Sequence, residues 1–125
     1  RLLYSLLKFT VLLLQVFLSD NLKRWILLRS SQFENKKNLN DVIWFHASSG
    51  EIEYCKSVIR EIKKLNPKQK IVVSYSSPSA EKLFNNIQEH VDLFFPLPWD
   101  QPFRLGLIID SLKPKALIFS RTDLW

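Results

Sequence analysis

The sequence feature that most constrains the fold is an alternation of short apolar runs with longer segments of helical period. Runs of this length that are apolar on both faces are typical of the buried strands of a parallel sheet. Between them, apolar residues recur at every third or fourth position, which predicts connecting helices. We therefore expect an α/β fold with a Rossmann-like parallel sheet and right-handed crossovers. The apolar runs occupy residues 42–47, 70–77, 91–97 and 116–120.

Three segments between these runs are predicted to be helical. The first covers 52–65 and ends at Asn66-Pro67, and the second opens at Ser77-Pro78-Ser79 with proline near its first turn. Apolar residues at positions 80, 83, 84 and 87 continue the second helix, and Lys113-Pro114 closes the third. In parallel sheets of this kind, ligands bind beyond the carboxyl ends of the strands. The loops 46–51, 74–79, 96–102 and 120–125 are therefore the candidate binding loops.

The N-terminal segment differs in character from the rest of the chain. Residues 2–18 are largely apolar, and their few polar residues form one narrow stripe at helical spacing. Trp25 then follows among Lys23, Arg24 and Arg29, a composition that the membrane headgroup region favours. We predict a membrane-associated helical segment over 1–32, either lying on or spanning the membrane, with a buried core helix as the alternative. A linker over 33–41 and a Rossmann-like domain over 42–125 complete the predicted organisation.

The distribution of charge supports a membrane partner and argues against nucleic acid. The chain has a net charge of +6. Residues 1–40 hold seven Lys/Arg against two Asp/Glu, which gives +5, while 41–125 hold eleven against ten, which gives +1. The folded domain is thus almost neutral, whereas a nucleic-acid-binding domain normally carries a basic face. An anionic membrane surface, with the domain on its cytoplasmic side, is the expected partner of the N-terminal segment.

Two further observations concern the chain as a whole. The single cysteine, Cys55, allows no internal disulfide and is expected to be a small packing residue. The chain has no methionine and stops directly after a predicted strand, so we expect it to be a fragment of a longer protein.

The most informative loop is the one that contains Gly50-Glu51. Glycine would let the chain turn sharply out of a strand into a helix. Glu51 would then lie at the helix start, where the dipole and free N–H groups favour its ionised form. Such a carboxylate can act as a general base, or it can simply complement the helix dipole. The residue pattern alone leaves both roles open and favours the second.

Several other chemistries lack their sequence signatures. The chain contains no GxGxxG fingerprint, no P-loop and no GxSxG nucleophile elbow. His46 and His90 lack companions at metal-ligand spacing, so neither a metal nor another cofactor is predicted. His46 is expected to position or pack. Ser77 and Ser79 are expected either to cap a helix or to hydrogen-bond a sugar or phosphate.

Four motifs occur in order behind the predicted membrane-associated N-terminus: WFHASSGE (44–51), SYSSPSA (74–80), PLPWDQP (96–102) and KPKALIFSRTDLW (113–125). Together they resemble the N-terminal domain of the 3-deoxy-D-manno-octulosonic acid (Kdo) transferases of lipopolysaccharide synthesis, and the resemblance covers essentially the whole chain. Two departures stand out: the chain is one residue shorter between His46 and Gly50 than the family pattern, and Arg121 replaces the glutamate that opens the family's ETELW. Asp123 keeps the second acid.

The resemblance implies a two-domain GT-B glycosyltransferase at the cytoplasmic face of the bacterial inner membrane. The N-terminal domain would bind the lipid A precursor, and a further C-terminal domain would bind CMP-Kdo. Glu51 would be the catalytic base of an inverting, metal-independent transfer. Another envelope GT-B enzyme with a different donor, or a membrane-tethered binding module without activity, are the alternatives. The substrate-binding residues that we expect are His46, Ser49, Gly50, Ser77, Ser79, Arg121 and Asp123.

Overall fold

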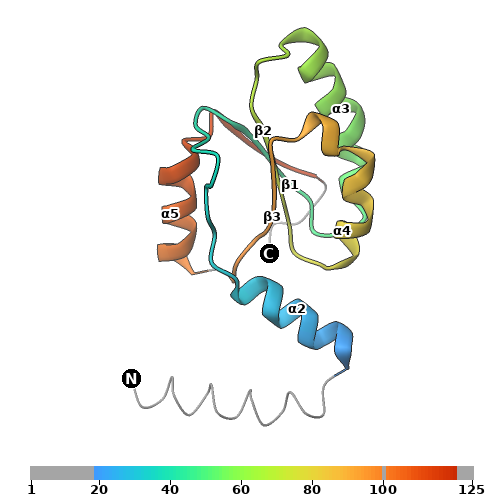
Figure 1. Cartoon of the computed structure of the whole chain (residues 1–125), viewed down its shortest axis with the longest axis vertical. Coiled ribbons are helices and arrows are strands. Elements are labelled where there is room, and N and C mark those ends of the chain that lie inside the picture. Colours follow the sequence, from blue (N-terminus) through green and yellow to red (C-terminus); the bar gives the residue numbers. More distant parts are fainter. Residues whose placement is uncertain (1–18, 100, 121–125) are drawn as a thin grey trace.

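The computed structural model describes residues 19–99 and 101–120, which form strands and helices in alternation (Figure 1). The α-helices are α2 (Asp20–Ser30), α3 (Ile52–Leu65), α4 (Ser79–Leu83) and α5 (Pro102–Leu112). The strands are β1 (Ile43–His46), β2 (Ile71–Tyr75), β3 (Leu93–Pro96) and β4 (Ala116–Phe119). Two short 3-10 helices, η1 (Phe84–Asn86) and η2 (Gln88–His90), follow α4.

The four strands make one parallel sheet in the order β3-β2-β1-β4. Phe45 of β1 pairs with Val73 of β2 on one side and with Ile118 of β4 on the other. The chain runs outward from β1 through β2 to β3, and then returns to add β4 on the opposite side of β1. The predicted α/β fold with a Rossmann-like parallel sheet is confirmed.

Helices cover both faces of the sheet, so the domain has three layers (Figure 1). Successive residues of a strand point to opposite faces, and the central strand β1 divides its side chains accordingly. Phe45 packs on the side of α3, while Trp44 packs on the side of α5. The core on the α3 side consists of Phe45, Ala47, Ile52, Cys55, Ile59, Ile71, Val73 and Ile87. The core on the α5 side consists of Leu39, Val42, Trp44, Val72, Phe95, Ile108 and Leu112.

The prediction of buried strands is correct for the centre of the sheet and wrong for one edge. All five residues of β2 are buried, whereas all four residues of β4 are exposed. Within the described residues, β4 pairs only with β1, so one of its sides carries no neighbouring strand. The apolar pattern of a strand indicates that its side chains can be buried. The position of the strand in the sheet determines how many neighbouring elements cover those side chains.

The second predicted helix is much shorter than its apolar pattern implies. Regular α-helix ends at Leu83, and 3-10 turns carry the chain through Phe84 to His90. Asn85 and Asn86 are weak helix formers, and Phe84 stacks on Phe94 of β3 with ring centroids 4.2 Å apart. Apolar contact with the edge strand, rather than helical geometry, therefore sets the path of this segment.

Helix α2 lies beyond the carboxyl end of the sheet and has no buried residue of its own (Figure 1). It is held through its side chains: Trp25 contacts Trp99 edge-on at a centroid distance of 4.7 Å. The guanidinium of Arg29 lies 4.8 Å from the Trp99 ring and donates to the carbonyl of Pro98. Among the described residues, no helix combines the length and apolar character that crossing a membrane requires. The membrane-associated helix predicted within residues 2–18 lies outside the described part.

The segment predicted as a linker, 33–41, runs along the domain. Leu39 is buried, and Phe33 packs on Phe95 at a centroid distance of 4.7 Å. The side chain of Asn35 accepts from Leu39 N at 2.9 Å and donates to Ser111 Oγ at 3.1 Å. The side chain of Asn35 thus forms hydrogen bonds within the segment and with α5.

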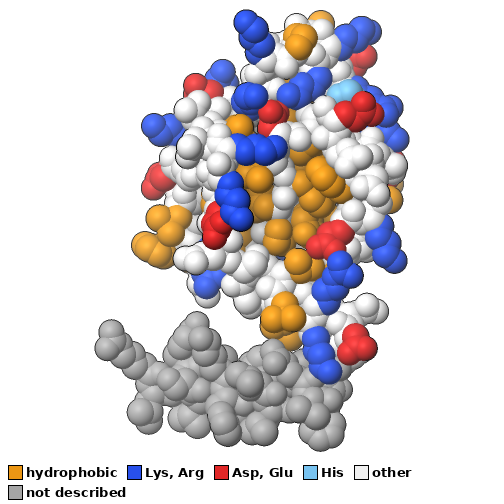
Figure 2. All heavy atoms as spheres, viewed as in Figure 1, with side chains coloured by type: hydrophobic (Ala, Val, Ile, Leu, Met, Phe, Trp, Pro, Cys, Tyr) orange, Lys and Arg blue, Asp and Glu red, His pale blue; other side chains and the backbone are white. Residues whose placement is uncertain are grey.

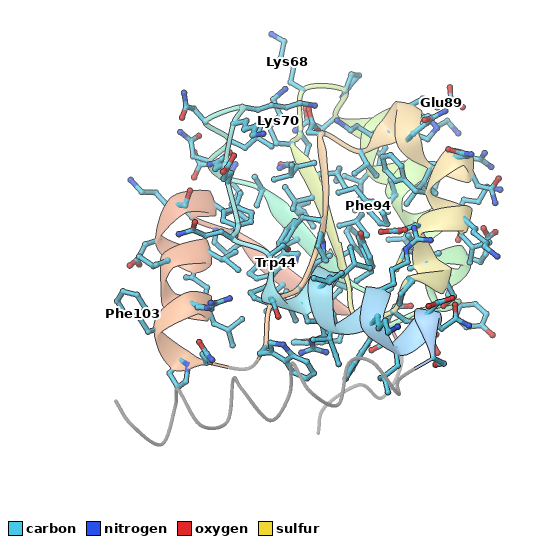
Figure 3. The ribbon with its side chains drawn as sticks, turned by 60° about the horizontal axis from the view of Figure 1, so that its bottom comes forward. Trp44, Lys68, Lys70, Glu89, Phe94 and Phe103 are labelled. Atoms are coloured by element: carbon cyan, nitrogen blue, oxygen red, sulfur yellow. The ribbon has the colours of Figure 1, made fainter. Side chains whose placement is uncertain are left out.

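At the amino end of the strands, a single carboxylate joins several elements. Asp92 accepts from the backbone N–H of Ile71 and from Lys63, both at 2.9 Å, and from Lys70 at 3.1 Å. Burial alone would raise the pKa of Asp92, but these hydrogen bonds outweigh it and lower the pKa. Lys70 and the nearby Lys68 stand at the end of the molecule away from α2 (Figure 3). Lys and Arg side chains are also gathered at this end in the space-filling view, above a group of hydrophobic side chains (Figure 2).

Candidate active site at the carboxyl end of the sheet

The topology places one loop at the position where ligands of parallel α/β sheets normally bind. The chain runs from β1 outward to β2 and β3 and then returns to place β4 on the other side of β1, so the strand order reverses at β1. A crevice opens at such a switch point. The loop after β1 holds residues 47–51, which include Gly50 and Glu51.

Glu51 lies immediately before α3, as the sequence predicts, and its side chain folds back onto the loop. Its Oε2 atom accepts from the backbone N–H of Ser49 at 2.9 Å and from the Ser49 hydroxyl at 3.0 Å. The residue is half-buried. These contacts fix the direction of the carboxylate within the loop, and both roles that the sequence left open for Glu51 stay predictions.

Backbone hydrogen bonds join the candidate loop to both neighbouring loops. The carbonyl of Ser48 accepts from the N–H groups of Ser76 and Ser77, at 3.1 and 2.8 Å. On the other side, Ser120 N donates to His46 O at 2.8 Å, and Ser120 Oγ donates to the Glu51 carbonyl at 2.9 Å. The loops after β1 and β2, together with Ser120 directly after β4, therefore form one connected rim.

Gly50 is not needed for the sharp turn from strand to helix that the sequence suggested. Its φ is not positive, so the turn does not need the conformational freedom of glycine. Apart from its two neighbours in the chain, no described residue has an atom within 4 Å of the position that a Cβ would take. Within the described part of the chain, the absent side chain instead leaves open space at this position.

His46 belongs to a buried chain of hydrogen bonds that runs across two strands. Its Nδ1 lies 2.9 Å from the hydroxyl of Ser74, the residue that pairs with it on β2. The indole Nε1 of Trp44 donates to the same hydroxyl at 2.8 Å. All three side chains are buried, and Trp44 can be seen in the interior of the molecule (Figure 3). The Ser74 hydroxyl thus fixes the orientation of the imidazole, and a role of His46 in positioning a substrate stays a prediction.

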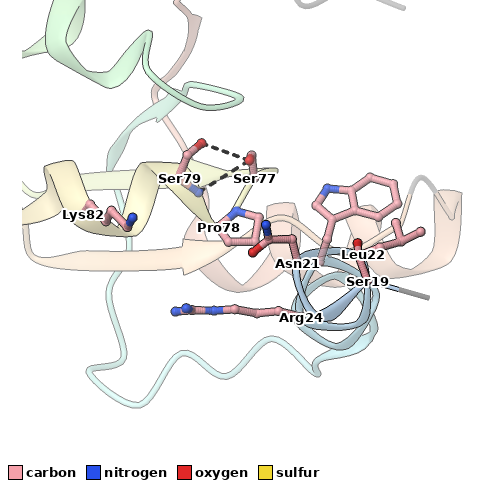
Figure 4. Close-up of a pocket in the computed structure, with 9 residues that line it drawn as sticks. Ser19, Asn21, Leu22, Arg24, Ser77, Pro78, Ser79 and Lys82 are labelled. Atoms are coloured by element: carbon pink, nitrogen blue, oxygen red, sulfur yellow. Dashed lines mark hydrogen bonds between the residues drawn. The ribbon is translucent and has the colours of Figure 1, made fainter. Parts of the chain in front are cut away.

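Ser77 and Ser79 lie at the start of α4, but neither caps it in the usual way. Ser77 Oγ is 3.5 Å from Ser79 N, which is too long for a good hydrogen bond, and the two hydroxyls lie 3.0 Å apart. Both residues line a pocket of about 660 Å³ between α2 and α4 (Figure 4). A binding role for Ser77 and Ser79 stays a prediction.

A second hydrogen-bonded chain fixes the wall of this pocket. The Tyr75 hydroxyl donates to Glu81 Oε1 at 2.8 Å, and the other carboxylate oxygen of Glu81 pairs with Arg24 of α2. Burial and the neighbouring Glu81 carboxylate raise the pKa of the Tyr75 phenol. Glu81 therefore attaches α2 to the sheet through one charged and one neutral partner.

The remaining titratable candidates lie elsewhere. In residues 19–99 and 101–120, His, Cys, Asp and Glu side chains form no group that could hold a metal ion. Cys55 lies on the buried face of α3, and this burial raises the pKa of its thiol, so it packs as predicted. Arg121 and Asp123 lie outside the described residues.

Sequence reasoning missed four residues of this region: Ser74, Ser120, Arg24 and Lys82. Ser74 had a readable signal, because it is a polar residue inside the apolar run IVVSY and its neighbours on both sides are buried. Arg24 was included only among the basic residues of the predicted membrane-associated segment, and Lys82 was not singled out. Arg24 and Lys82 come close only because α2 packs on α4, and no local sequence pattern predicts that packing.

The fold and the rim define the class of protein: a parallel α/β domain with one oriented carboxylate among hydroxyl-bearing residues at its topological switch point. Residues 23–125 match the model of a family described as 3-deoxy-D-manno-octulosonic-acid transferase (kdotransferase). The chain belongs to this family, as the motif resemblance predicted.

Curated relatives agree with this assignment. The chain is 32% identical over 101 residues to a 3-deoxy-D-manno-octulosonic acid transferase of Aquifex aeolicus, covering 80% of this chain and 28% of that protein. It is 26% identical to the enzyme of the same name from Chlamydia muridarum, over 88% of this chain and 26% of the relative. A bifunctional glycosyltransferase/methyltransferase of Fusobacterium nucleatum is 24% identical over 98% of this chain and 20% of its own length. The chain thus spans less than a third of the length of each of these relatives.

Proposed function

We propose that the chain is the acceptor-binding part of an enzyme that transfers Kdo from CMP-Kdo to the lipid A precursor in lipopolysaccharide synthesis. Family membership supports the reaction class. The observation that carries the assignment of the site is the position of Glu51, whose carboxylate is oriented by Ser49 at the switch point of the sheet. The donor would be bound by a further domain of the full-length protein.

In the proposed mechanism, Glu51 acts as general base. Its carboxylate takes the proton from a glucosamine hydroxyl of the acceptor, and that oxygen attacks the anomeric carbon of Kdo. The bond from this carbon to the phosphate oxygen of CMP breaks, CMP leaves, and the configuration inverts. Orientation of the two substrates supplies most of the rate gain, since the protein forms no covalent bond with either of them.

The surrounding residues have supporting roles in this proposal. Ser49 holds the carboxylate, and the open space at Gly50 admits the sugar ring beside it. His46, fixed by Ser74, orients the acceptor from the floor of the site. Ser77 and Ser79 offer hydroxyls to the same substrate from the next loop. Arg121 and Asp123 stay predicted substrate contacts.

The test is Glu51→Gln in the full-length enzyme. Glutamine keeps the size and the hydrogen bonds from Ser49 but cannot accept the proton, so transfer should fall by about 10²–10⁴-fold. The matched control is Glu53→Gln, which changes an exposed carboxylate two residues further along and should leave transfer unchanged. Turnover near the wild-type rate in Glu51→Gln would reject the role of base.

Membrane attachment at the cytoplasmic face of the inner membrane is part of the same proposal. The basic, apolar N-terminal segment supports it. Removing residues 1–18 should move the protein to the soluble fraction, and the cut belongs before Ser19 because Trp25 and Arg29 pack on Trp99. Sedimentation of the truncated protein with membranes at moderate salt would place the attachment elsewhere.

A further inference from the structure

We propose that Ser74 is a positioning residue of the candidate site: its hydroxyl donates to Nδ1 of His46 and thereby fixes the ring proton of His46 on Nε2. His46 then serves the site as a hydrogen-bond donor and not as a base. The position of the proton follows from the buried contacts that Ser74 makes with Trp44 and His46. The role of this donor in the reaction rests on the proposed function.

The Ser74 hydroxyl has two partners inside the protein. Trp44 Nε1 lies 2.8 Å from Ser74 Oγ, and His46 Nδ1 lies 2.9 Å from the same atom. Trp44 and His46 are two residues apart on β1, so they share one face of the sheet, and Ser74 is the residue of β2 that pairs with His46. Two adjacent strands, rather than a loop, therefore hold the three groups in place.

The chemistry of the three groups gives these contacts a direction. An indole N–H can only donate, so Ser74 Oγ accepts from Trp44. A serine hydroxyl has one hydrogen to donate, and among the residues that the structure describes only His46 offers it an acceptor. Ser74 is 0% exposed, so bulk water is not an alternative acceptor. The hydrogen of the Ser74 hydroxyl therefore points at His46 Nδ1.

The opposite arrangement would leave a buried donor without a partner. A proton on His46 Nδ1, in the other neutral tautomer or in the imidazolium, would be donated to Ser74 Oγ, which would then accept twice. The hydrogen of Ser74 would have no acceptor in the described part of the chain, and an unpaired buried donor costs its full desolvation penalty. Since the contact of one imidazole nitrogen determines which nitrogen holds the proton, the neutral ring with its proton on Nε2 is favoured.

This tautomer gives His46 and Glu51 different tasks. His46 is the last residue of β1 and lies directly before the loop 47–51. The two ring nitrogens point in different directions, so a proton on Nε2 makes a donor that faces away from Ser74. The lone pair of Nδ1 is occupied by the Ser74 hydroxyl and is not available to take a proton from a substrate. In the proposed reaction, Glu51 takes the proton, while His46 Nε2 donates a hydrogen bond to an oxygen of the acceptor sugar.

The direct test determines the tautomer in the full-length protein and needs no variant. Long-range ¹H–¹⁵N correlation spectra of protein labelled with ¹⁵N-histidine distinguish protonated from unprotonated ring nitrogens. The His46 signals are assigned through their nuclear Overhauser effects to the Phe119 ring, which meets the imidazole edge-on at a centroid distance of 5.9 Å. At neutral pH, Nε2 should be protonated and Nδ1 unprotonated. A proton on Nδ1, in the neutral or the charged ring, would overturn the proposal.

Two substitutions of Ser74 test its role as a positioning residue. In Ser74→Ala, the Nδ1 resonance should move toward that of an unprotonated nitrogen without a hydrogen bond. The KM for the acceptor should rise roughly three- to tenfold, and kcat should change less, because the contact is made before and during the reaction alike. Ser74→Thr keeps the hydroxyl and should restore both values.

The matched control is Ser57→Ala, which removes an exposed hydroxyl from α3 and should change neither measurement. Urea unfolding of each variant identifies the conditions in which it is folded, and the kinetics are compared there. If folded Ser74→Ala keeps the wild-type KM, Ser74 is only a structural residue and the positioning role is wrong.

The spectra and the kinetics separate this inference from the proposed function. If Glu51→Gln stays active while His46 carries its proton on Nε2, the base assignment fails and the tautomer stands. If Glu51→Gln abolishes transfer while His46 carries a proton on Nδ1, the base assignment stands and the inference about Ser74 is wrong.

Discussion

Glu51 and Asp92 are both half-buried carboxylates at the ends of strands in the same sheet, but they lie at opposite edges and have different partners. Asp92, at the amino end, accepts from two lysines and a backbone N–H, and its side chain is 17% exposed. Glu51, at the carboxyl end, is oriented by the N–H and hydroxyl of Ser49. Asp92 links α3, β2 and the start of β3, whereas the loop that holds Glu51 borders open space at Gly50.

The comparison suggests a division of roles: the carboxylate at the amino end of the sheet stabilises the fold, and the one at the carboxyl end is the candidate for catalysis. A carboxylate surrounded by lysines is held in its charged form and contributes to folding, but it is a poor base because its pKa is lowered. Two lysines and a backbone N–H tie Asp92 to the fold, while the contacts with Ser49 fix the direction of the Glu51 carboxylate within the candidate loop.

The largest expected effect is on transfer. In the full-length enzyme, Glu51→Gln should lose about 10²–10⁴-fold in turnover, while Asp92→Asn should keep the wild-type rate at temperatures where it stays folded. The two amide substitutions are chemically identical, so any difference between them reports the environment. Comparable activity losses in both folded variants would show that the two edges are not functionally distinct.

Asp92→Asn should change stability and its dependence on pH. We expect the chain to lose about 1–2 kcal/mol in urea unfolding at neutral pH, since charged hydrogen bonds are replaced by partly solvated neutral ones. Because the folded-state pKa of Asp92 is lowered, its contribution is present above the unfolded pKa of about 3.9 and is lost as the pH falls through the folded pKa. The variant should therefore lose less stability than the wild type on acidification below about pH 4. Parallel acid profiles would contradict this account.

Ser74→Ala tests the hydrogen-bond network under the candidate site. The substitution removes the hydroxyl that Trp44 Nε1 and His46 Nδ1 share inside the protein. Leaving buried polar atoms without this partner should cost about 1–3 kcal/mol in urea unfolding. The ¹⁵N shifts of the His46 ring should also move, because Nδ1 loses its contact with the Ser74 hydroxyl. Ser79→Ala, which removes an exposed hydroxyl, is the control and should leave both measurements unchanged.

The smallest expected effect on folding is that of Gly50→Ala. Its φ is not positive and a methyl group would meet open space, so stability should change by no more than about 0.5 kcal/mol. Transfer should nevertheless decrease, because the methyl group enters the space proposed for the acceptor. Gly106→Ala in α5 is the comparison: it also has room, should stabilise the helix slightly and should not affect transfer. A large loss of stability in Gly50→Ala would restore the conformational explanation of this glycine.

Much of the fold was predictable because it follows from local patterns. The period of residues 52–65 predicted α3 with the bounds that the structure has, and the apolar runs predicted every strand to within a few residues. The second helix was overestimated because Phe84 is drawn to Phe94, a contact with β3 that periodicity does not contain. The exposure of β4 was missed for a similar reason, since strand order is not written in the apolarity of one strand.

The candidate site likewise has some features that the sequence predicts and others that depend on the tertiary structure. The sequence by itself determined which loops carry the site and that Glu51 stands at the start of a helix, because strand ends and helix starts are short-range features. Only the tertiary structure decided that β1 is the switch point, that Ser74 lies beneath His46, and that Arg24 and Lys82 border one pocket. The physical reason is separation along the chain: Arg24 and Lys82 are joined by the docking of α2 through Trp25, Arg29 and Glu81. Such contacts arise from packing between whole elements, which a local residue pattern cannot encode.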